Sequence, residues 1–130
     1  MLGVAVTLAG VTLSAQDPDA ITFAAIGDMG TGGPGQKQVA EAMAGVSRSR
    51  PFDFILTLGD NFYGTGVLSV EDPQWQSKFV EMYSDPALQV PFHPSLGNHD
   101  HQGNPVAEVE YSKHNQRWQM PAQYYTFTET

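Results

Sequence analysis

The feature that most constrains this chain is a pattern that occurs three times: an apolar run, a glycine, and then a residue whose side chain can bind a metal. The runs are Ile21 to Ile26, Phe52 to Leu58 and Val90 to Leu96, and they lead into Gly27-Asp28, Gly59-Asp60 and Gly97-Asn98-His99. Nearly continuous apolar strands of this kind are typical of a sheet that is covered on both faces. The pattern therefore predicts three buried strands, each followed by a sharp turn.

Helices are predicted between and after these strands from the spacing of apolar residues. The expected faces are Val39, Ala42, Met43 and Val46 in a helix over Gly35 to Ser47; Trp75, Phe79, Met82 and Tyr83 in a helix that Asp72 caps and Pro73 begins; and Ala107, Tyr111, His114 and Trp118 in a helix from Asn104-Pro105 to about Trp118. Trp75 and Trp118 are expected in the core. An alternating run, Tyr125 to Thr128, predicts a further strand. The order predicts an α/β fold with parallel strands joined by crossovers.

Composition limits the partners and the metal chemistry. Six Lys and Arg residues against fourteen Asp and Glu residues give a net charge of −8, so neither nucleic acid nor a membrane surface is expected as a partner. A small phosphate ester is still a suitable ligand if cations lie between it and the carboxylates, because a bound multivalent ion reverses the local field. The chain has no cysteine, so any metal must be held by oxygen and imidazole ligands.

The start of the chain has the composition of a secretory leader. Met1 to Ala15 are nearly all apolar or small, and Leu13-Ser14-Ala15 precede a polar stretch, as in the apolar region and cleavage site of a signal peptide. We therefore expect residues 1–20 to be a leader and the protein to be secreted or periplasmic. The positive charge that usually precedes such a region is missing, and an apolar strand is the alternative interpretation.

The residues that follow the strands form a candidate metal centre. In open α/β sheets, ligands bind outside the carboxyl ends of the strands, and Asp28, Asp60, Asn98 and His99 would all lie there. Two carboxylates, an amide oxygen and an imidazole suit Fe, Mn, Zn or Mg. Without a cation the two carboxylates would repel each other, and one would tend to bind a proton.

These residues also carry a family resemblance. Gly27-Asp28-Met29-Gly30, Gly59-Asp60-Asn61-Phe62-Tyr63 and Gly97-Asn98-His99-Asp100 resemble the first three of five motifs in calcineurin-like metallophosphoesterases. A tyrosine three residues after the second aspartate is similar to the purple acid phosphatases, and the surrounding sequence is similar to their tartrate-resistant branch. The resemblance covers residues 21 to 128. It implies the N-terminal β-α-β-α-β half of a four-layer α/β/β/α sandwich.

The resemblance also implies roles for individual residues. Asp28 and Tyr63 would bind a ferric ion, Asp60 would bridge it to a divalent ion (Fe, Zn or Mn), and Asn98 would bind that second ion. His99 would lie near the substrate and act as a general acid, held by a partner such as Asp100. The paired cations would lower the pKa of a bound water and supply hydroxide to attack a phosphate monoester.

The same resemblance indicates that the site is incomplete. The family adds histidines from two later motifs, Val-x-x-His and Gly-His-x-His, and neither follows the third motif in this sequence. We therefore expect residues 21–130 to be the N-terminal part of a metallophosphoesterase domain and to turn over little substrate alone. His93, His101 and His114 are each more typical of packing or surface residues, with His101 the best placed to reach a ligand.

Three hypotheses about function remain open from the sequence. The first is an acid phosphatase that acts on phosphate monoesters. The second is a metallophosphoesterase that acts on nucleotides, phosphoproteins or diesters. The third is a module that binds metal or phosphate without catalysis.

Overall fold

The computed structural model of the chain describes residues 19–129. Its sheet contains three parallel strands in the order β1 (Phe23–Ile26), β2 (Phe54–Leu58) and β3 (Phe92–Ser95). Phe23 lies opposite Phe54, and Ile55 lies opposite Phe92. Each strand lies within the apolar run that predicted it, so the α/β class and the parallel arrangement are confirmed.

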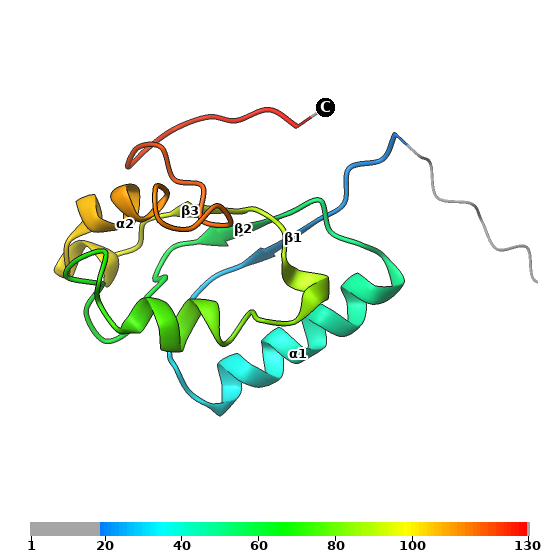
Figure 1. Ribbon diagram of the computed structural model, residues 1–130, viewed down its shortest axis with the longest axis horizontal. Helices are drawn as coiled ribbons and strands as arrows, with labels where there is room; N and C mark the ends of the chain where they lie inside the picture. Colours follow the sequence, from blue (N-terminus) through cyan, green and yellow to red (C-terminus); the bar gives the residue numbers. More distant parts are fainter. Residues whose placement is uncertain (1–18, 130) are drawn as a thin grey trace, which may run out of the picture.

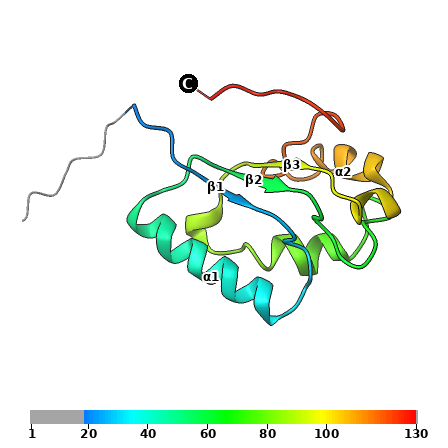
Figure 2. The ribbon, with the colours of Figure 1, turned by 180° about the vertical axis from the view of Figure 1, so that it is seen from behind.

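The two faces of the sheet are covered by different parts of the chain. The helix α1 (Pro34–Ser49) and the short helix η1 (Trp75–Val80) lie on one side of the sheet, and residues 121–129 cross the other side (Figures 1 and 2). The core lies between the sheet and the helices, and Ile55 and Phe92 from the strands belong to it. The crossover through α1 is what keeps β1 and β2 parallel, because parallel strands cannot be joined by a tight turn.

The helix α1 was predicted in the right place but with the wrong buried face. Of the four predicted residues only Met43 is buried, whereas Val39 and Val46 are 50% and 55% exposed. The buried face contains Gln36, Ala40, Met43, Ala44 and Ser47. Its polar members bind backbone carbonyls of neighbouring segments: the Gln36 amide donates to Lys78 at 2.6 Å and the Ser47 hydroxyl donates to Ala87 at 2.8 Å. Apolar spacing missed this face because the helix is held partly by hydrogen bonds.

The segment after β2 contains two short helices, η1 and η2 (Pro86–Leu88). The predicted start at Asp72 and Pro73 is wrong, because η1 begins at Trp75 with Gln74 as its N-cap residue and has no side-chain cap. The Asp72 carboxylate accepts the backbone N–H of Gln74 at 2.9 Å in the turn that precedes the helix. The η1 turn is wide, with a bond from Glu81 N–H to the Gln76 carbonyl, which is the spacing of a π-helix. Its predicted face is confirmed for Trp75, Phe79 and Tyr83, which are all buried.

Aromatic rings form the centre of the core. The ring of Phe79 lies 5.0 Å from Trp118 and 5.1 Å from Phe92, in edge-to-face arrangements. Trp75 stacks on Tyr111 at 3.6 Å. The predicted core positions of Trp75 and Trp118 are confirmed, with exposures of 3% and 0%.

The last predicted helix is shorter than expected. The helix α2 (Pro105–Tyr111) begins at the predicted cap, where the Asn104 side chain accepts the Val106 N–H at 3.2 Å. It ends at Tyr111 because the chain turns back there: the Ser112 hydroxyl donates to the Met120 carbonyl and accepts the Met120 N–H. Trp118 reaches the core from this returning segment and not from a helix.

The predicted strand over Tyr125 to Thr128 is wrong. The edge of β3 is already occupied by the returning segment, since Phe92 exchanges backbone hydrogen bonds with Arg117 and Gln119. Residues 125–129 instead lie over the face of the sheet opposite α1 (Figure 1). The Phe127 ring stacks on His93 at 3.8 Å, and the Tyr125 hydroxyl donates to the Pro94 carbonyl.

The predicted leader, residues 1–20, lies almost entirely outside the described residues. Within residues 19–129, none of the helices has the length and apolar character needed to cross a membrane.

The position of α1 is tested by one substitution at two sites. Ala44→Leu should lower the free energy of unfolding by about 1–3 kcal/mol, because Ala44 is 1% exposed and a larger side chain would overpack the core. The control Val46→Leu should change it by less than about 0.5 kcal/mol, because Val46 is exposed. Urea denaturation measures both, and the opposite order of effects would show that the predicted face was right.

Candidate metal centre

The residues after β1 and β2 have an unusual backbone conformation. Asp28 and Asp60 both have positive φ, 54° and 53°, in the left-handed region that few residues other than glycine adopt. The Asp28 N–H donates to the Gly59 carbonyl at 3.1 Å, which joins the two loops. Strained backbone of this kind is concentrated at functional sites, so both predicted ligands lie where a functional site is expected.

Tyr63 brings the two aspartates together. Its hydroxyl donates to Asp28 Oδ1 and also lies 3.0 Å from Asp60 Oδ2. The hydrogen bond to Asp28 raises the pKa of Tyr63 well above its usual value, and burial and Asp60 add to this effect. Two carboxylates and a phenol therefore share one small region, and a cation bound there would replace the phenolic proton.

Asp60 also contacts the loop after β3. Its Oδ1 accepts the backbone N–H of His99 at 2.9 Å. This hydrogen bond lowers the pKa of Asp60, against the opposing effect of burial. Asp60 lies between Tyr63 on one side and the β3 loop on the other, which suits the bridging position expected of it.

Asn98 and His99 lie at the end of β3. The Asn98 side chain is exposed, and no hydrogen bond joins it to the two aspartates in the part of the chain that the structure describes. His99 Nδ1 is bonded to the Gly64 carbonyl. A carbonyl only accepts, so Nδ1 carries the hydrogen, and Nε2 is the ring nitrogen left for a ligand.

Asp100 does not have the position predicted for it. It was expected to hold His99, but it is fully buried and has no hydrogen bond to His99 within residues 19–129. Its carboxylate instead accepts the backbone N–H groups of Asn61, Phe62 and Gly97 at 3.1, 3.2 and 2.8 Å. Asp100 therefore holds the loops that carry the candidate ligands, and the Gly64 carbonyl orients His99.

Two residues near the site were missed by sequence reasoning. The Lys78 ammonium donates to the Tyr63 carbonyl and to Gln74 Oε1, and burial lowers its pKa. Asn61 is fully buried, and its Nδ2 donates to Ser95, Asp100 and Glu108. Lys78 was missed because it looks like an ordinary polar helix position. Asn61 lies within the second motif, but its role was missed because a buried network of side-chain hydrogen bonds has no signature in the sequence.

The other histidines do not join the site. His93 is buried against Phe127 on the face of the sheet opposite α1, and burial lowers its pKa. His101 and His114 are exposed. Among residues 19–129, no three His, Asp or Glu side chains are placed to hold a metal by themselves.

Comparison with known proteins places this chain in a family. The sequence model of the calcineurin-like phosphoesterases matches residues 21–129. This chain belongs to the calcineurin-like phosphoesterase family.

Among the individual relatives of the chain are acid phosphatases. The phosphoesterase chain is 43% identical over 113 residues to tartrate-resistant acid phosphatase type 5 of Sus scrofa, covering 81% of this chain and 33% of that protein. It is 40% identical over 90 residues to purple acid phosphatase 3 of Arabidopsis thaliana, covering 68% and 25%. The chain thus spans about a third or less of the curated relatives it matches.

A solved structure supports the fold. GAP50, described as the anchor in the inner membrane complex of Plasmodium, matches with a TM-score of 0.74 and 30% identity, covering 81% of this chain and 35% of that one. The matched region therefore makes up about a third of that protein's chain.

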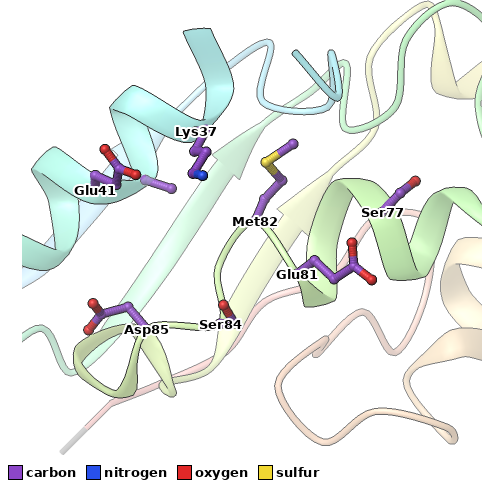
Figure 3. A pocket seen from close by; sticks show the side chains of 8 residues that line it. Lys37, Glu41, Ser77, Glu81, Met82, Ser84 and Asp85 are labelled. Carbon is purple, nitrogen blue, oxygen red and sulfur yellow. The ribbon is translucent and has the colours of Figure 1, made fainter. Parts of the chain in front are cut away.

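Two hollows lie near the crossovers of this phosphoesterase chain. One, of about 280 Å³, contains Asp28 and is walled by Met29, Val39 and Tyr83. The other, of about 400 Å³, lies between α1 and η1 and is lined by Lys37, Glu41, Ser77, Glu81 and Asp85 among others (Figure 3). The second hollow contains none of the predicted ligands, and Asp28 is the one predicted ligand that lines the first.

The contact between the two loops is tested by adding one methyl group. A Cβ at Gly97 would lie 2.2 Å from Asp60 Oδ1 and 2.3 Å from Asp60 N. Gly97→Ala should therefore displace Asp60 and lower the free energy of unfolding by about 1–3 kcal/mol. The control Gly45→Ala, where no atom lies within 4 Å of the new Cβ, should stabilise α1 by about 0.5–1 kcal/mol. Equal effects of the two substitutions in a thermal melt would contradict the close approach of Gly97 to Asp60.

Proposed function

We propose that this chain carries the N-terminal part of the dinuclear metal centre of an acid phosphatase that hydrolyses phosphate monoesters. The observation that carries the proposal is the shared position of the Tyr63 hydroxyl, which contacts both Asp28 and Asp60. The 43% sequence identity to a tartrate-resistant acid phosphatase also supports the proposal.

The donor atoms fit the metals that this function needs. Asp28 and Tyr63 would hold a ferric ion, Asp60 would contact both ions, and Asn98 would hold a divalent Fe, Zn or Mn ion. Carboxylate, phenolate and amide oxygens suit such cations. In their absence the phenolic proton of Tyr63 partly neutralises the two carboxylates, which is consistent with a site built for positive charge.

The bound cations, His99 and Asp100 are proposed to have different roles in the reaction. When bound, the two cations would activate a water and neutralise the phosphoryl oxygens. His99 is the proposed general acid: with Nδ1–H held by the Gly64 carbonyl, its Nε2–H can donate to the departing oxygen of the ester. Asp100 acts indirectly, by holding the backbones on either side of the site.

Residues 21–130 are proposed to form only part of the catalytic domain. The chain supplies three proposed ligands to the ferric ion and two to the divalent ion, counting Asp60 twice. We therefore expect weak binding of the second ion and little turnover by the chain alone. The apolar composition of residues 1–15 supports a proposed secreted or periplasmic location.

A non-catalytic role is the second candidate, and the likeness to GAP50 favours it. That protein is described as an anchor, and this chain matches its fold at 30% identity. In this alternative the strand-end residues would bind metal or phosphate without turnover. A phosphatase that acts on nucleotides or diesters would be separated from both by its substrate preference.

Iron binding tests the role of Tyr63. The 130-residue chain titrated with Fe(III) should develop a visible absorption band, because a phenolate bound to ferric iron gives a charge-transfer transition. Tyr63→Phe should remove the band. Tyr124→Phe should leave it intact, because Tyr124 is 91% exposed. A band that survives in Tyr63→Phe would show that another residue binds the iron.

Activity is tested in a chimera that supplies the remaining part of the domain. Residues 21–129 would replace the matching segment of the Sus scrofa phosphatase, and hydrolysis of p-nitrophenyl phosphate would be measured with iron and zinc or manganese. The chimera should be active. Asp60→Asn should lower its kcat/KM by more than roughly 10- to 100-fold, which is the loss typical of substituting a residue that only hydrogen-bonds to a metal ligand.

The control for the chimera is Glu110→Gln, a substitution of the same kind at an exposed position, which should keep full activity. A chimera that folds and binds metal without turnover would favour the non-catalytic alternative. Activity confined to diesters would favour the other enzyme class.

A further inference from the structure

A buried pair of carboxyl groups lies beneath the candidate metal centre. Asp100, in the short helix η3 (Asp100–Gln102), and Glu108, in α2, are both 0% exposed, and Asn61 links their carboxyl groups. Asn61 donates from Nδ2 to Asp100 Oδ2 at 3.2 Å and to Glu108 Oε2 at 3.1 Å. These three side chains, which we name the carboxyl cluster, come from three separate elements.

Only one of the two carboxyl groups in the carboxyl cluster is expected to be ionised. In the part of the chain that the structure describes, neither carboxyl group has an ion-pair partner. Two buried carboxylates without a cation repel each other, so one of them binds a proton. Asp100 accepts three backbone N–H groups, which stabilise a carboxylate. The proton therefore belongs to Glu108.

The surroundings of Glu108 agree with this assignment. Its Oε1 is buried without a hydrogen-bond donor, which a negative oxygen would tolerate poorly. Burial first, and then the charge of Asp100, raise its pKa from 4.5 to about 9. Asp100 is the charged group that faces it. Asn61, facing it from the loop after β2, and Trp118, whose indole N–H donates to the Glu108 carbonyl, are neutral.

The hydrogen bonds of Asp100 connect Glu108 to the site. Asn61 and Phe62, whose N–H groups Asp100 accepts, lie between Asp60 and Tyr63 in the sequence, and Gly97 directly precedes Asn98. A shift of Asp100 would therefore move the ligands of both loops relative to each other. Glu108 is the second carboxyl group that Asn61 contacts, beside Asp100.

We propose that Glu108 is a positioning residue. As a carboxylic acid it donates a hydrogen bond to Asp100, and it thereby fixes the position of the loop after β2 relative to the loop after β3. Its importance for metal binding rests on the proposed function, whereas its protonation and its hold on the two loops do not. This hydrogen bond is present at acidic and neutral pH and is lost as Glu108 ionises.

The sign of the pH dependence follows from the proton balance. The unfolded chain releases the Glu108 proton near its ordinary pKa of 4.5, and the folded chain keeps it to about 9. Between these values the folded state binds more protons, so raising the pH destabilises it, by up to about tenfold in the folding equilibrium constant per pH unit. This contribution is fully present below pH 4.5 and is lost as the pH rises to about 9.

Urea denaturation of the metal-free chain from about pH 5 to about pH 9 tests this balance. Glu108→Gln keeps a neutral side chain with one donor and one acceptor, so it should flatten the pH dependence and exceed the wild type in stability at the alkaline end. Glu110→Gln, on the exposed side of the same helix, should follow the wild-type curve. A Glu108→Gln curve parallel to the wild type would overturn the proposal.

A direct measurement covers the case in which variants fold poorly. Carbon-detected NMR of the wild-type chain should show the Glu108 carboxyl carbon titrating near pH 9. The backbone nitrogens of Asn61, Phe62 and Gly97 should change with the same midpoint. Titration of Glu108 at its ordinary pKa, or no response of those nitrogens, would overturn the proposal whether or not the chain binds metal.

Iron affinity separates positioning from simple stability. Glu108→Ala should weaken Fe(III) binding about tenfold under conditions where the variant is folded, and Glu108→Gln should restore it. Unchanged affinity in the folded Glu108→Ala chain would overturn the positioning role. If the wild type bound no iron, the proposed metal centre would fail, and the NMR titration would still decide the role of Glu108.

Discussion

Two loops that leave neighbouring strands meet at Asp60, and the position of every other group in the candidate centre depends on this contact. One oxygen of Asp60 accepts the His99 N–H and the other lies beside the Tyr63 hydroxyl. The loops approach so closely that a Cβ at Gly59 would lie 3.0 Å from the Gly97 Cα. Glycines at the strand ends are needed here because no side chain fits between the two backbones.

The site and the layer beneath it handle negative charge in different ways. Asp28 and Asp60 lie at an accessible edge, where a phenolic proton joins them and cations are proposed to bind. Asp100 and Glu108 are buried, where no cation reaches them, and one proton takes the place of a counter-ion. Cations are thus proposed to offset the charge of the exposed pair, and a proton that of the buried pair.

The strands and the loops that follow them could be predicted from the sequence, because they depend on the pattern of apolar residues and glycines. The directions of individual side chains could not. Three apolar runs with glycine ends sufficed for the parallel sheet and for placing Asp28 and Asp60 at one edge. The buried face of α1 was missed because Gln36 and Ser47 pack through hydrogen bonds. Asp100 was misplaced because the direction of a side chain within a turn has no signature in the sequence. Glu108 was overlooked because a charged helix residue is normally exposed.

The central claim is that cations bind between Asp28, Asp60 and Tyr63, and anomalous diffraction tests it most directly. A crystal of this chain grown with Fe(III) and measured at the iron absorption edge should give a peak within bonding distance of Asp28 Oδ1, Asp60 Oδ2 and the Tyr63 oxygen. Iron bound elsewhere on the chain, with the Tyr63 hydroxyl still donating to Asp28, would contradict the account.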